Sequence, residues 1–166
     1  YVDLVKHGVD VAVRVGPMLD SSLIACKIGE GDRVLVASPD YLDKNQRIET
    51  VEDLSQHKCL TYTRGSSPEE WSFKSTDDKL HQVKVTGHFS SNNPDVLNKA
   101  AVEGRGLALV MLWSARDDIA AGRLVSVLPQ YRPQPFPVNV VYPERKFTPH
   151  RVTLFIDLLR QVYQQR

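Results

Sequence analysis

Four groups of residues in this 166-residue chain have side chains that could hold a small molecule. Each group follows an apolar run typical of a β-strand, and ligands of open α/β sheets bind beyond the carboxyl ends of strands. The first group is Arg14 with Gly16, after an alternating run of valines. A guanidinium can bind a carboxylate through two charge-assisted hydrogen bonds. A structural ion pair or simple exposure to solvent would explain Arg14 equally well.

The second group is the polar loop that follows a predicted strand over residues 59–63. The loop offers hydroxyls, a guanidinium and a glycine at Tyr62, Thr63, Arg64, Gly65, Ser66 and Ser67. The glycine would let the backbone approach a ligand closely. An ordinary polar turn is the alternative.

The third group is Asn92 and Asn93, which precede a predicted helix N-terminus, a position that favours anions. Pro94 has no N–H to offer and Asp95 adds a negative charge, so Asn93 could instead only cap its own helix. The fourth group is Met111, at the end of a further apolar run. Its side chain would either line a pocket or belong to the core.

The residue patterns of common enzymes are absent from the sequence. It has no GxSxG, HExxH or GxxxxGK[ST] motif, and no GxGxxG follows a strand. The five histidines are scattered, and Cys26 and Cys59 lie in apolar runs without metal-ligand spacing. Two such cysteines indicate small buried side chains in a reducing compartment. We therefore predict a protein that binds rather than catalyses, without metal or cofactor, in the cytoplasm.

Net charge and hydropathy limit the kinds of partner, nucleic acid or membrane, that this chain could bind. Lys and Arg number 21 against 20 Asp and Glu, a formal net charge of +1, which argues against a nucleic-acid surface in this part of the protein. No apolar stretch approaches the ~18 residues of a membrane-spanning helix. The chain begins with Tyr1, and residues 1–7 resemble the middle of a helix. We expect it to be part of a longer protein whose N-terminus is missing.

Apolar periodicity and turn residues predict the elements that must position these groups. Helices are expected over residues 39–44, 51–57, 94–103, 113–121 and 149–163, and strands over 9–15, 23–28, 33–38, 59–63, 83–89, 107–112, 124–128 and 138–142. We expect residues 83–89 to form one long strand in which Gly87 is a bulge, with His81 and His88 on opposite faces. The last helix has apolar residues at the spacing of one helix face: Val152, Phe155, Ile156, Leu159, Val162 and Tyr163.

Alternating strands and helices predict an α/β fold with mostly parallel sheets flanked by helices. We expect the chain to cross between two lobes at two places: the interrupted strand at 23–38 and the proline-rich stretch after Leu128. The prediction is a first lobe of residues 1–28 and 138–166, a second lobe of residues 29–128, and a connector at 129–137.

The sequence also resembles the effector-binding domain of LysR-type transcriptional regulators. The matching segments are 10–16 (DVAVRVG), 20–25 (DSSLIA), 33–42 (RVLVASPDYL), 52–54 (EDL), 57–60 (HKCL), Asn92-Asn93, 104–109 (GRGLAL), 121–125 (AGRLV), 128–129 (LP), 141–143 (VYP) and 155–157 (FID). They follow the family order and spacing nearly from end to end.

The resemblance implies the two-lobed fold of type 2 periplasmic binding proteins, with two crossing strands and a small anionic or aromatic effector between the lobes. It also implies homodimers or homotetramers, and DNA binding only through an N-terminal winged helix-turn-helix that is absent here. Its effector contacts would be Arg14, Gly16, the loop 62–67, Asn92, Asn93 and Met111. Family members usually have proline where Met111 stands, and their first lobe begins some tens of residues earlier. A periplasmic receptor for solute uptake is the alternative function.

Overall fold

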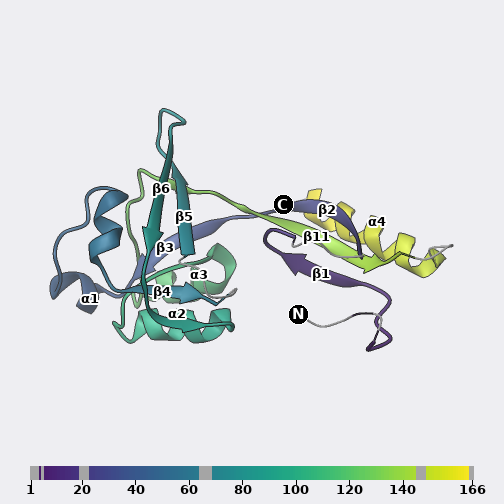
Figure 1. Cartoon of the computed structure of the whole chain (residues 1–166), viewed down its shortest axis with the longest axis horizontal. Coiled ribbons are helices and arrows are strands. Elements are labelled where there is room, and N and C mark those ends of the chain that lie inside the picture. Colours follow the sequence, from purple (N-terminus) through teal and green to yellow (C-terminus); the bar gives the residue numbers. More distant parts are fainter. Residues whose placement is uncertain (1–3, 5, 19–22, 64–68, 145–148, 165–166) are drawn as a thin grey trace. The chain divides into compact units, whose positions relative to one another are not determined.

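The computed structural model describes residue 4 and residues 6–18, 23–63, 69–144 and 149–164. The chain forms two compact units (Figure 1). Unit 1 comprises Tyr1–Gly31 and Pro135–Arg166, and unit 2 comprises Asp32–Gln134. The two-lobed α/β fold expected from the sequence is therefore confirmed.

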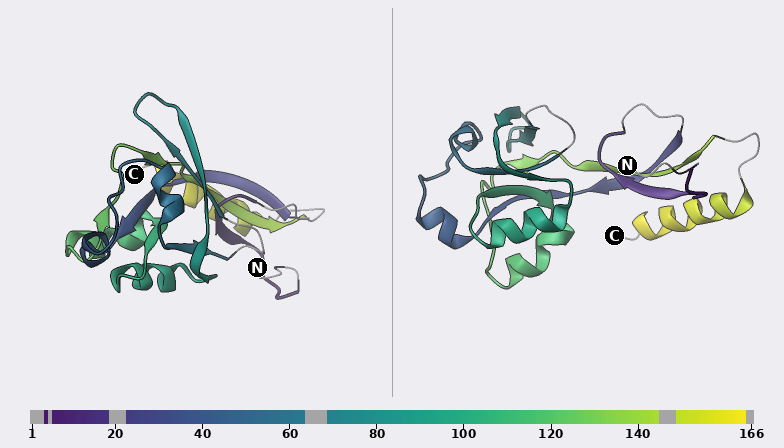
Figure 2. Two further views of the ribbon diagram at one scale, coloured as in Figure 1. Left: turned by 60° about the vertical axis from the view of Figure 1, so that its left-hand side comes forward. Right: turned by 60° about the horizontal axis from the view of Figure 1, so that its bottom comes forward.

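Unit 1 is a three-stranded antiparallel sheet with one helix on it. The strands are β1 (Ala12–Val15), β11 (Phe136–Pro143) and β2 (Leu23–Gly31), with β11 in the centre. Helix α4 (His150–Gln164) runs alongside this sheet (Figure 2, right). Its buried Val152 and Ile156 pack on Val140 of β11. The amphipathic helix expected here forms because these residues recur on one helix face.

Unit 2 is built on a five-stranded sheet in the order β7-β4-β8-β3-β9. Its strands are β7 (Gly87–Ser91), β4 (Cys59–Tyr62), β8 (Leu107–Met111), β3 (Arg33–Ala37) and β9 (Val125–Ser126). Helices α2 (Pro94–Val102) and α3 (Leu112–Ala120) pack on one face, around Val36, Leu60 and Val110.

A second layer encloses the other core of unit 2. It consists of a small antiparallel sheet, β10 (Arg132–Pro133), β5 (Glu69–Lys74) and β6 (Leu80–Val85), with the short helices α1 (Pro39–Asp43) and η1 (Glu52–Gln56). Trp71 and Phe73 of β5 are buried there against Leu35 and Leu107. Strand β5 was not predicted from the sequence, although its apolar residues alternate with Glu70 and Ser72 as in a half-buried strand.

The expectation of mostly parallel sheets is wrong. Only β4–β7 and β4–β8 are parallel, and every other pairing in the described residues is antiparallel. Strands 23–31 and 136–143 pair with each other as antiparallel neighbours, and β5 and β6 form a hairpin. Alternation along the chain indicates the kind of element but not the direction of its neighbour.

The single strand expected over residues 83–89 is also wrong. The chain changes sheet at Thr86, so that β6 pairs with β5 and β7 pairs with β4. His81 and His88 consequently lie in different sheets. A Cβ built on Gly87 would lie 2.2 Å from Oγ1 of Thr61, so the glycine permits a close approach of β7 to β4.

Candidate functional site

The structure brings five of the predicted contact residues to one edge of the unit 2 sheet. Because β4 is parallel to β7 and β8, the carboxyl ends of these three strands lie at the same edge. The strands end at Tyr62, Ser91 and Met111, and the predicted Thr63, Asn92 and Asn93 follow directly. We call this set the carboxyl edge: Tyr62, Thr63, Ser91, Asn92, Asn93 and Met111.

Hydrogen bonds hold the two strand ends together at the carboxyl edge. The N–H of Thr63 donates to the carbonyl oxygen of Ser91 at 3.0 Å, and the N–H of Asn93 donates to Oγ of Ser91 at 3.1 Å. One residue deeper, the hydroxyls of Thr61 and Ser90 lie 2.7 Å apart. These contacts order the backbone at the position where a ligand of an α/β sheet binds.

Asn93 and Met111 also have structural roles here. Oδ1 of Asn93 accepts the N–H of Asp95 at 2.9 Å and caps α2, as the sequence indicated. The neighbouring Asn92 is exposed and follows the end of β7. Met111 is half-buried, and its carbonyl accepts the hydroxyl of Ser114 at 2.8 Å at the start of α3. The side chains of Asn92 and Met111 therefore lie at this edge and take no part in the helix-capping hydrogen bonds described above.

The other predicted residues lie elsewhere. Arg14 and Gly16 belong to unit 1, where Arg14 is half-buried and lies opposite Asn139 in the β1–β11 register. Gly16 has a φ of 104°, which favours glycine, and its N–H donates to the carbonyl of Pro137 at 2.9 Å. Arg64 and Ser66 lie outside the described residues.

Two charged residues at this edge were missed by the sequence analysis. Oε2 of Glu69 accepts the N–H of Tyr62 at 2.8 Å. Arg33 begins β3 directly opposite Met111, and its Nε donates to the carbonyl of Gln134 at 2.7 Å. Because β3 is antiparallel to β8, its first residue reaches the edge where β8 ends. A search limited to the carboxyl ends of strands could not find Arg33.

The chemistry available at the carboxyl edge is hydrogen bonding and charge. Its described residues carry hydroxyl, amide and thioether groups, and the neighbouring Glu69 and Arg33 add charges of opposite sign. Within the described ranges, no three His, Cys, Asp or Glu side chains are grouped as metal ligands. No helix of the described chain is long and apolar enough to cross a membrane. This arrangement can bind and orient a small polar molecule.

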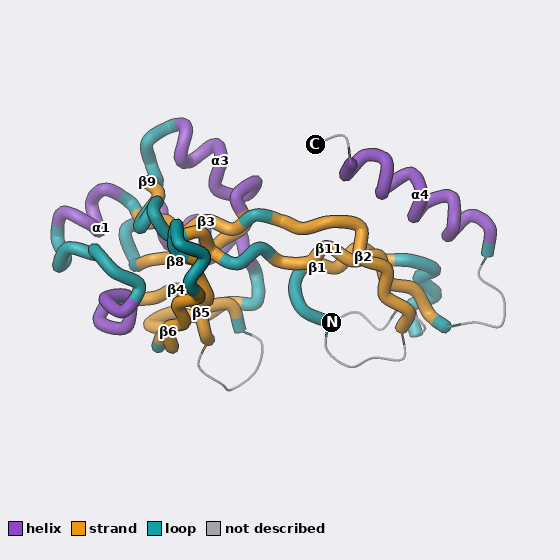
Figure 3. Tube along the Cα trace, turned by 90° about the horizontal axis from the view of Figure 1, so that it is seen from above, coloured by secondary structure: helices purple, strands orange, loops and turns teal. Residues whose placement is uncertain are grey.

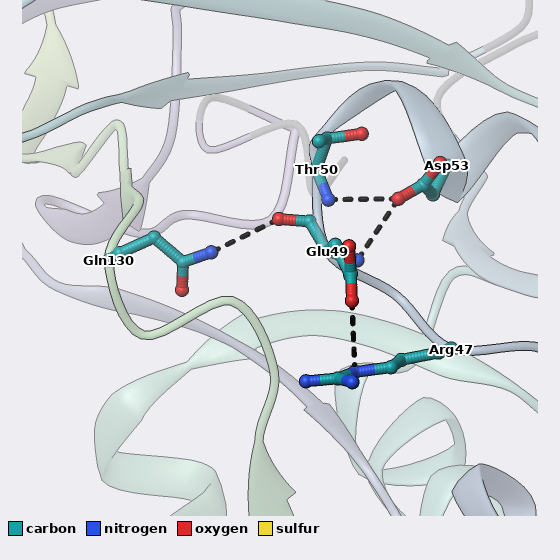
Figure 4. Close-up of polar contacts among 5 residues, drawn as sticks. All are labelled: Arg47, Glu49, Thr50, Asp53 and Gln130. Carbon is teal, nitrogen blue, oxygen red and sulfur yellow. Dashed lines mark hydrogen bonds and ion pairs between the residues drawn. The ribbon is translucent and has the colours of Figure 1, made fainter.

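A polar cavity of about 570 Å³ lies at the opposite edge of the unit 2 sheet. It is lined by Lys44, Asn45, Gln46, Gln56 and His57, which come from the segments that follow β3 and precede β4. Hydrogen bonds link the neighbouring loop at Glu49 and Thr50 to Asp53 and Gln130 (Figure 4). Oδ2 of Asp53 accepts the N–H groups of Glu49 and Thr50, at 3.0 and 2.9 Å, and Gln130 donates to the carbonyl of Glu49 at 3.1 Å. The two backbone hydrogen bonds lower the pKa of Asp53.

Comparison with known families gives one match that spans nearly the whole chain. The family described as the LysR substrate binding domain matches residues 1–164. A relative from Escherichia coli K12, the HTH-type transcriptional regulator DmlR, is 35% identical over 165 residues, which are 99% of this chain and 53% of the relative. The regulator CrgA of Neisseria meningitidis serogroup C is 31% identical over 160 residues, 96% of this chain and 53% of its own. The chain thus spans about half the length of these relatives.

Solved structures agree with these sequence matches. The regulatory domain of the C227S variant of AphB from Vibrio vulnificus has a TM-score of 0.74 at 33% identity, covering 93% of this chain and 75% of that one. The regulatory domain of CrgA from Neisseria meningitidis has a TM-score of 0.74 at 28% identity, covering 96% and 78%.

Proposed function

Because this chain belongs to the family of LysR substrate-binding domains, we propose that it is the effector-sensing part of a bacterial transcriptional regulator and works by binding a small molecule without transforming it. The effector would bind at the carboxyl edge of unit 2. The full-length protein would act in the cytoplasm as a homo-oligomer that binds DNA through another domain.

The convergence of three strand ends at one edge is the observation that carries the effector site. Parallel strands present their carboxyl ends to ligands in α/β proteins, and here those ends supply Tyr62, Asn92 and Met111. Arg33 would favour an anionic group on the effector, because guanidinium–carboxylate pairs combine charge with two directed hydrogen bonds.

The proposed mechanism is a shift in populations. An effector that binds one arrangement of the regulator more tightly than another favours that arrangement, and typical couplings are about 1–3 kcal/mol. The uptake receptor considered as an alternative has no support among the relatives described above, each of which is a transcriptional regulator or a part of one.

A thermal-shift screen of small organic acids and aromatic compounds tests this proposal. A compound that binds only the folded protein stabilises it, by about 2.7 kcal/mol at a concentration about 100 times its Kd. We expect Asn92→Ala and Arg33→Ala each to weaken the binding of such a compound about tenfold. This is the effect of losing about one hydrogen bond between protein and ligand.

Gln56→Ala is the matched control, since Gln56 is an exposed side chain in the polar cavity at the other edge of the same sheet. This variant should bind the hit unchanged. If Gln56→Ala abolished binding while Asn92→Ala and Arg33→Ala left it intact, the carboxyl edge would not be the effector site.

A further inference from the structure

The polar cavity at the opposite edge of the unit 2 sheet takes no part in the proposed effector site. Strand β3 runs antiparallel to β8, and β4 runs parallel to it, so the carboxyl end of β3 lies at the edge where β4 begins. Figure 3 shows α1 and the loop that follows it at one end of β4 and β8. The volume of the cavity, about 570 Å³, lies within the ~300–1,000 Å³ that is usual for small-molecule sites.

The side chains that line this cavity in the described part of the chain are all polar, and none is a carboxylate. They supply one ammonium group, three amides and one imidazole: Lys44, Asn45, Gln46, Gln56 and His57. Burial lowers the pKa of His57, so at neutral pH its ring carries one N–H donor and one acceptor nitrogen. The cavity therefore combines a single positive charge with several neutral hydrogen-bonding groups.

The fold leaves much of this hydrogen-bonding capacity unused. Gln46 and Gln56 are exposed, and neither side-chain amide makes a hydrogen bond to another described residue. Nδ2 of Asn45 donates to the carbonyl of Tyr41 at 2.7 Å, and its Oδ1 remains an acceptor. Each amide group has two N–H donors and one acceptor oxygen. Three amides in one cavity can thus pair with neighbouring hydroxyl groups as donors and as acceptors.

Lys44 carries the positive charge of the cavity, and its own ion pair is weak. Its Nζ lies 3.8 Å from Oδ2 of Asp40, and the two side chains are 76% and 83% exposed. Such exposed pairs stabilise a protein little, so Lys44 can turn from Asp40 to an anion at small cost. Two further carboxylates beside the cavity already have partners: Glu49 pairs with Arg47 at 3.1 Å, and Asp53 accepts two backbone N–H groups.

The backbone on both sides of the cavity is held in place by the buried Tyr41. Its hydroxyl lies 3.2 Å from Nδ1 of His57 and accepts the N–H of Lys58 at 3.1 Å. These contacts join α1 to the segment that leads into β4, and the lining residues come from just after α1 and just before β4. The cavity is therefore formed before a ligand arrives, which reduces the ordering cost of binding.

We propose that this cavity is a second ligand site of unit 2, and that it binds a small polyhydroxylated anion such as a sugar acid or a sugar phosphate. Lys44 binds the anionic group, and the amides of Gln46 and Gln56 bind hydroxyl groups. One ammonium among neutral donors and acceptors matches a ligand with one anionic end and several hydroxyls. A planar aromatic ligand would need a stacking surface, and among the described lining residues only the imidazole of His57 is a ring.

A matched series of three ligands tests the proposal. Glucose, gluconate and glucose 6-phosphate each carry several hydroxyl groups and differ in having no anionic group, a carboxylate or a phosphate. In NMR titrations of the isotope-labelled protein, we expect both anions to bind at millimolar concentrations and to shift the side-chain amide signals of Gln46 and Gln56. Glucose should bind at least about tenfold more weakly, because it lacks the charge-assisted contact with Lys44.

The stronger of the two anions identifies the anionic group as carboxylate or phosphate. If neither anion bound at millimolar concentrations, or if glucose bound as tightly as the anions, the proposal would be wrong.

Substitutions of charged residues test the role of Lys44. Lys44→Ala should weaken the binding of both anions at least about tenfold, whereas Asp40→Asn should strengthen it, because it removes the carboxylate that competes for Lys44. Lys58→Ala is the matched control, since Lys58 is an exposed lysine that does not line the cavity, and it should change the affinity by less than about twofold. Equal losses in Lys44→Ala and Lys58→Ala would show that only the general surface charge attracts the anions, and would overturn the proposal.

Two amide substitutions separate this cavity from the effector site. Gln56→Ala should weaken the binding of the sugar anions, and Asn92→Ala should leave it unchanged. The opposite result would place these anions at the carboxyl edge and overturn the proposal. A failure of the whole sugar series would leave the effector site standing, because effector binding is measured separately at Asn92 and Arg33.

Discussion

The hydroxyl of Tyr41 lies 3.2 Å from Nδ1 of His57 and also accepts the N–H of Lys58 at 3.1 Å. Which of the two groups donates in the Tyr41–His57 contact depends on the tautomer of His57. This contact joins α1 to the segment that leads into β4. Burial lowers the pKa of His57 from its ordinary 6.5, against a smaller opposing effect of Asp53.

The lowered pKa predicts a loss of stability on mild acidification. The folded state binds the proton more weakly than the unfolded state, so the contribution of neutral His57 is complete above about pH 6.5 and declines as the pH falls through the folded pKa. In His57→Gln this part of the pH dependence should disappear. Unfolding by urea at a series of pH values measures it, and identical pH profiles for the two proteins would contradict the prediction.

The two cysteines should differ sharply in reactivity. Burial, assisted by the charge of Glu69, raises the pKa of Cys59 to about 12, and its thiol donates to the carbonyl of Leu54 at 3.4 Å. Cys26 is half-buried beside Arg160. Because the thiolate is the reactive form, iodoacetamide should label Cys26 in the folded protein and Cys59 only after unfolding. Mass spectrometry of the labelled peptides checks this order, and prior labelling of Cys59 would refute it.

Gly29 should tolerate no side chain while Tyr163 is present. A Cβ built on Gly29 would clash with Cδ1 of the Tyr163 ring, so Gly29→Ala must displace that ring. We expect a cost of about 1–3 kcal/mol in unfolding free energy, as for other overpacked sites. The same substitution in a Tyr163→Ala background should cost clearly less. An equal cost in both backgrounds would rule out the ring as the obstacle.

Asn98 links the two helices on the outer face of unit 2. Its Nδ2 donates to the carbonyl of Ser114 at 3.2 Å and to Oδ2 of Asp118 at 2.8 Å. Asn98→Ala should cost about 1–3 kcal/mol, the usual effect of removing one partner of a buried polar contact. The stability of each variant follows from urea unfolding at neutral pH.

Asn98→Asp should lower the unfolding free energy more than Asn98→Ala at neutral pH, because it places a second carboxylate next to that of Asp118. The repulsion raises the pKa of the pair in the folded state, so the lost stability should return as the pH falls through that raised pKa. A variant whose deficit relative to the natural protein is the same at every pH would show that charge plays no part.

Local patterns were sufficient to predict the helices that border the site. Asn93, Pro94 and Gly104 mark the ends of α2 because capping and proline geometry depend only on residues close in sequence. The side of α4 that holds Val152 and Ile156 followed from its periodicity for the same reason. The sequence resemblance also predicted the family, because its motifs keep their order and spacing along the chain.

Only the tertiary structure decided which strands are neighbours and which residues share an edge. Alternation shows which face of a strand is buried but not which strand lies beside it. For this reason β6 and β7 were predicted as one strand, and β5 was not predicted. The same limit hid Arg33, which reaches the carboxyl edge only because β3 runs antiparallel to β8. Strand pairing joins residues far apart in the chain, and its hydrogen bonds are made by backbone groups that every residue except proline possesses.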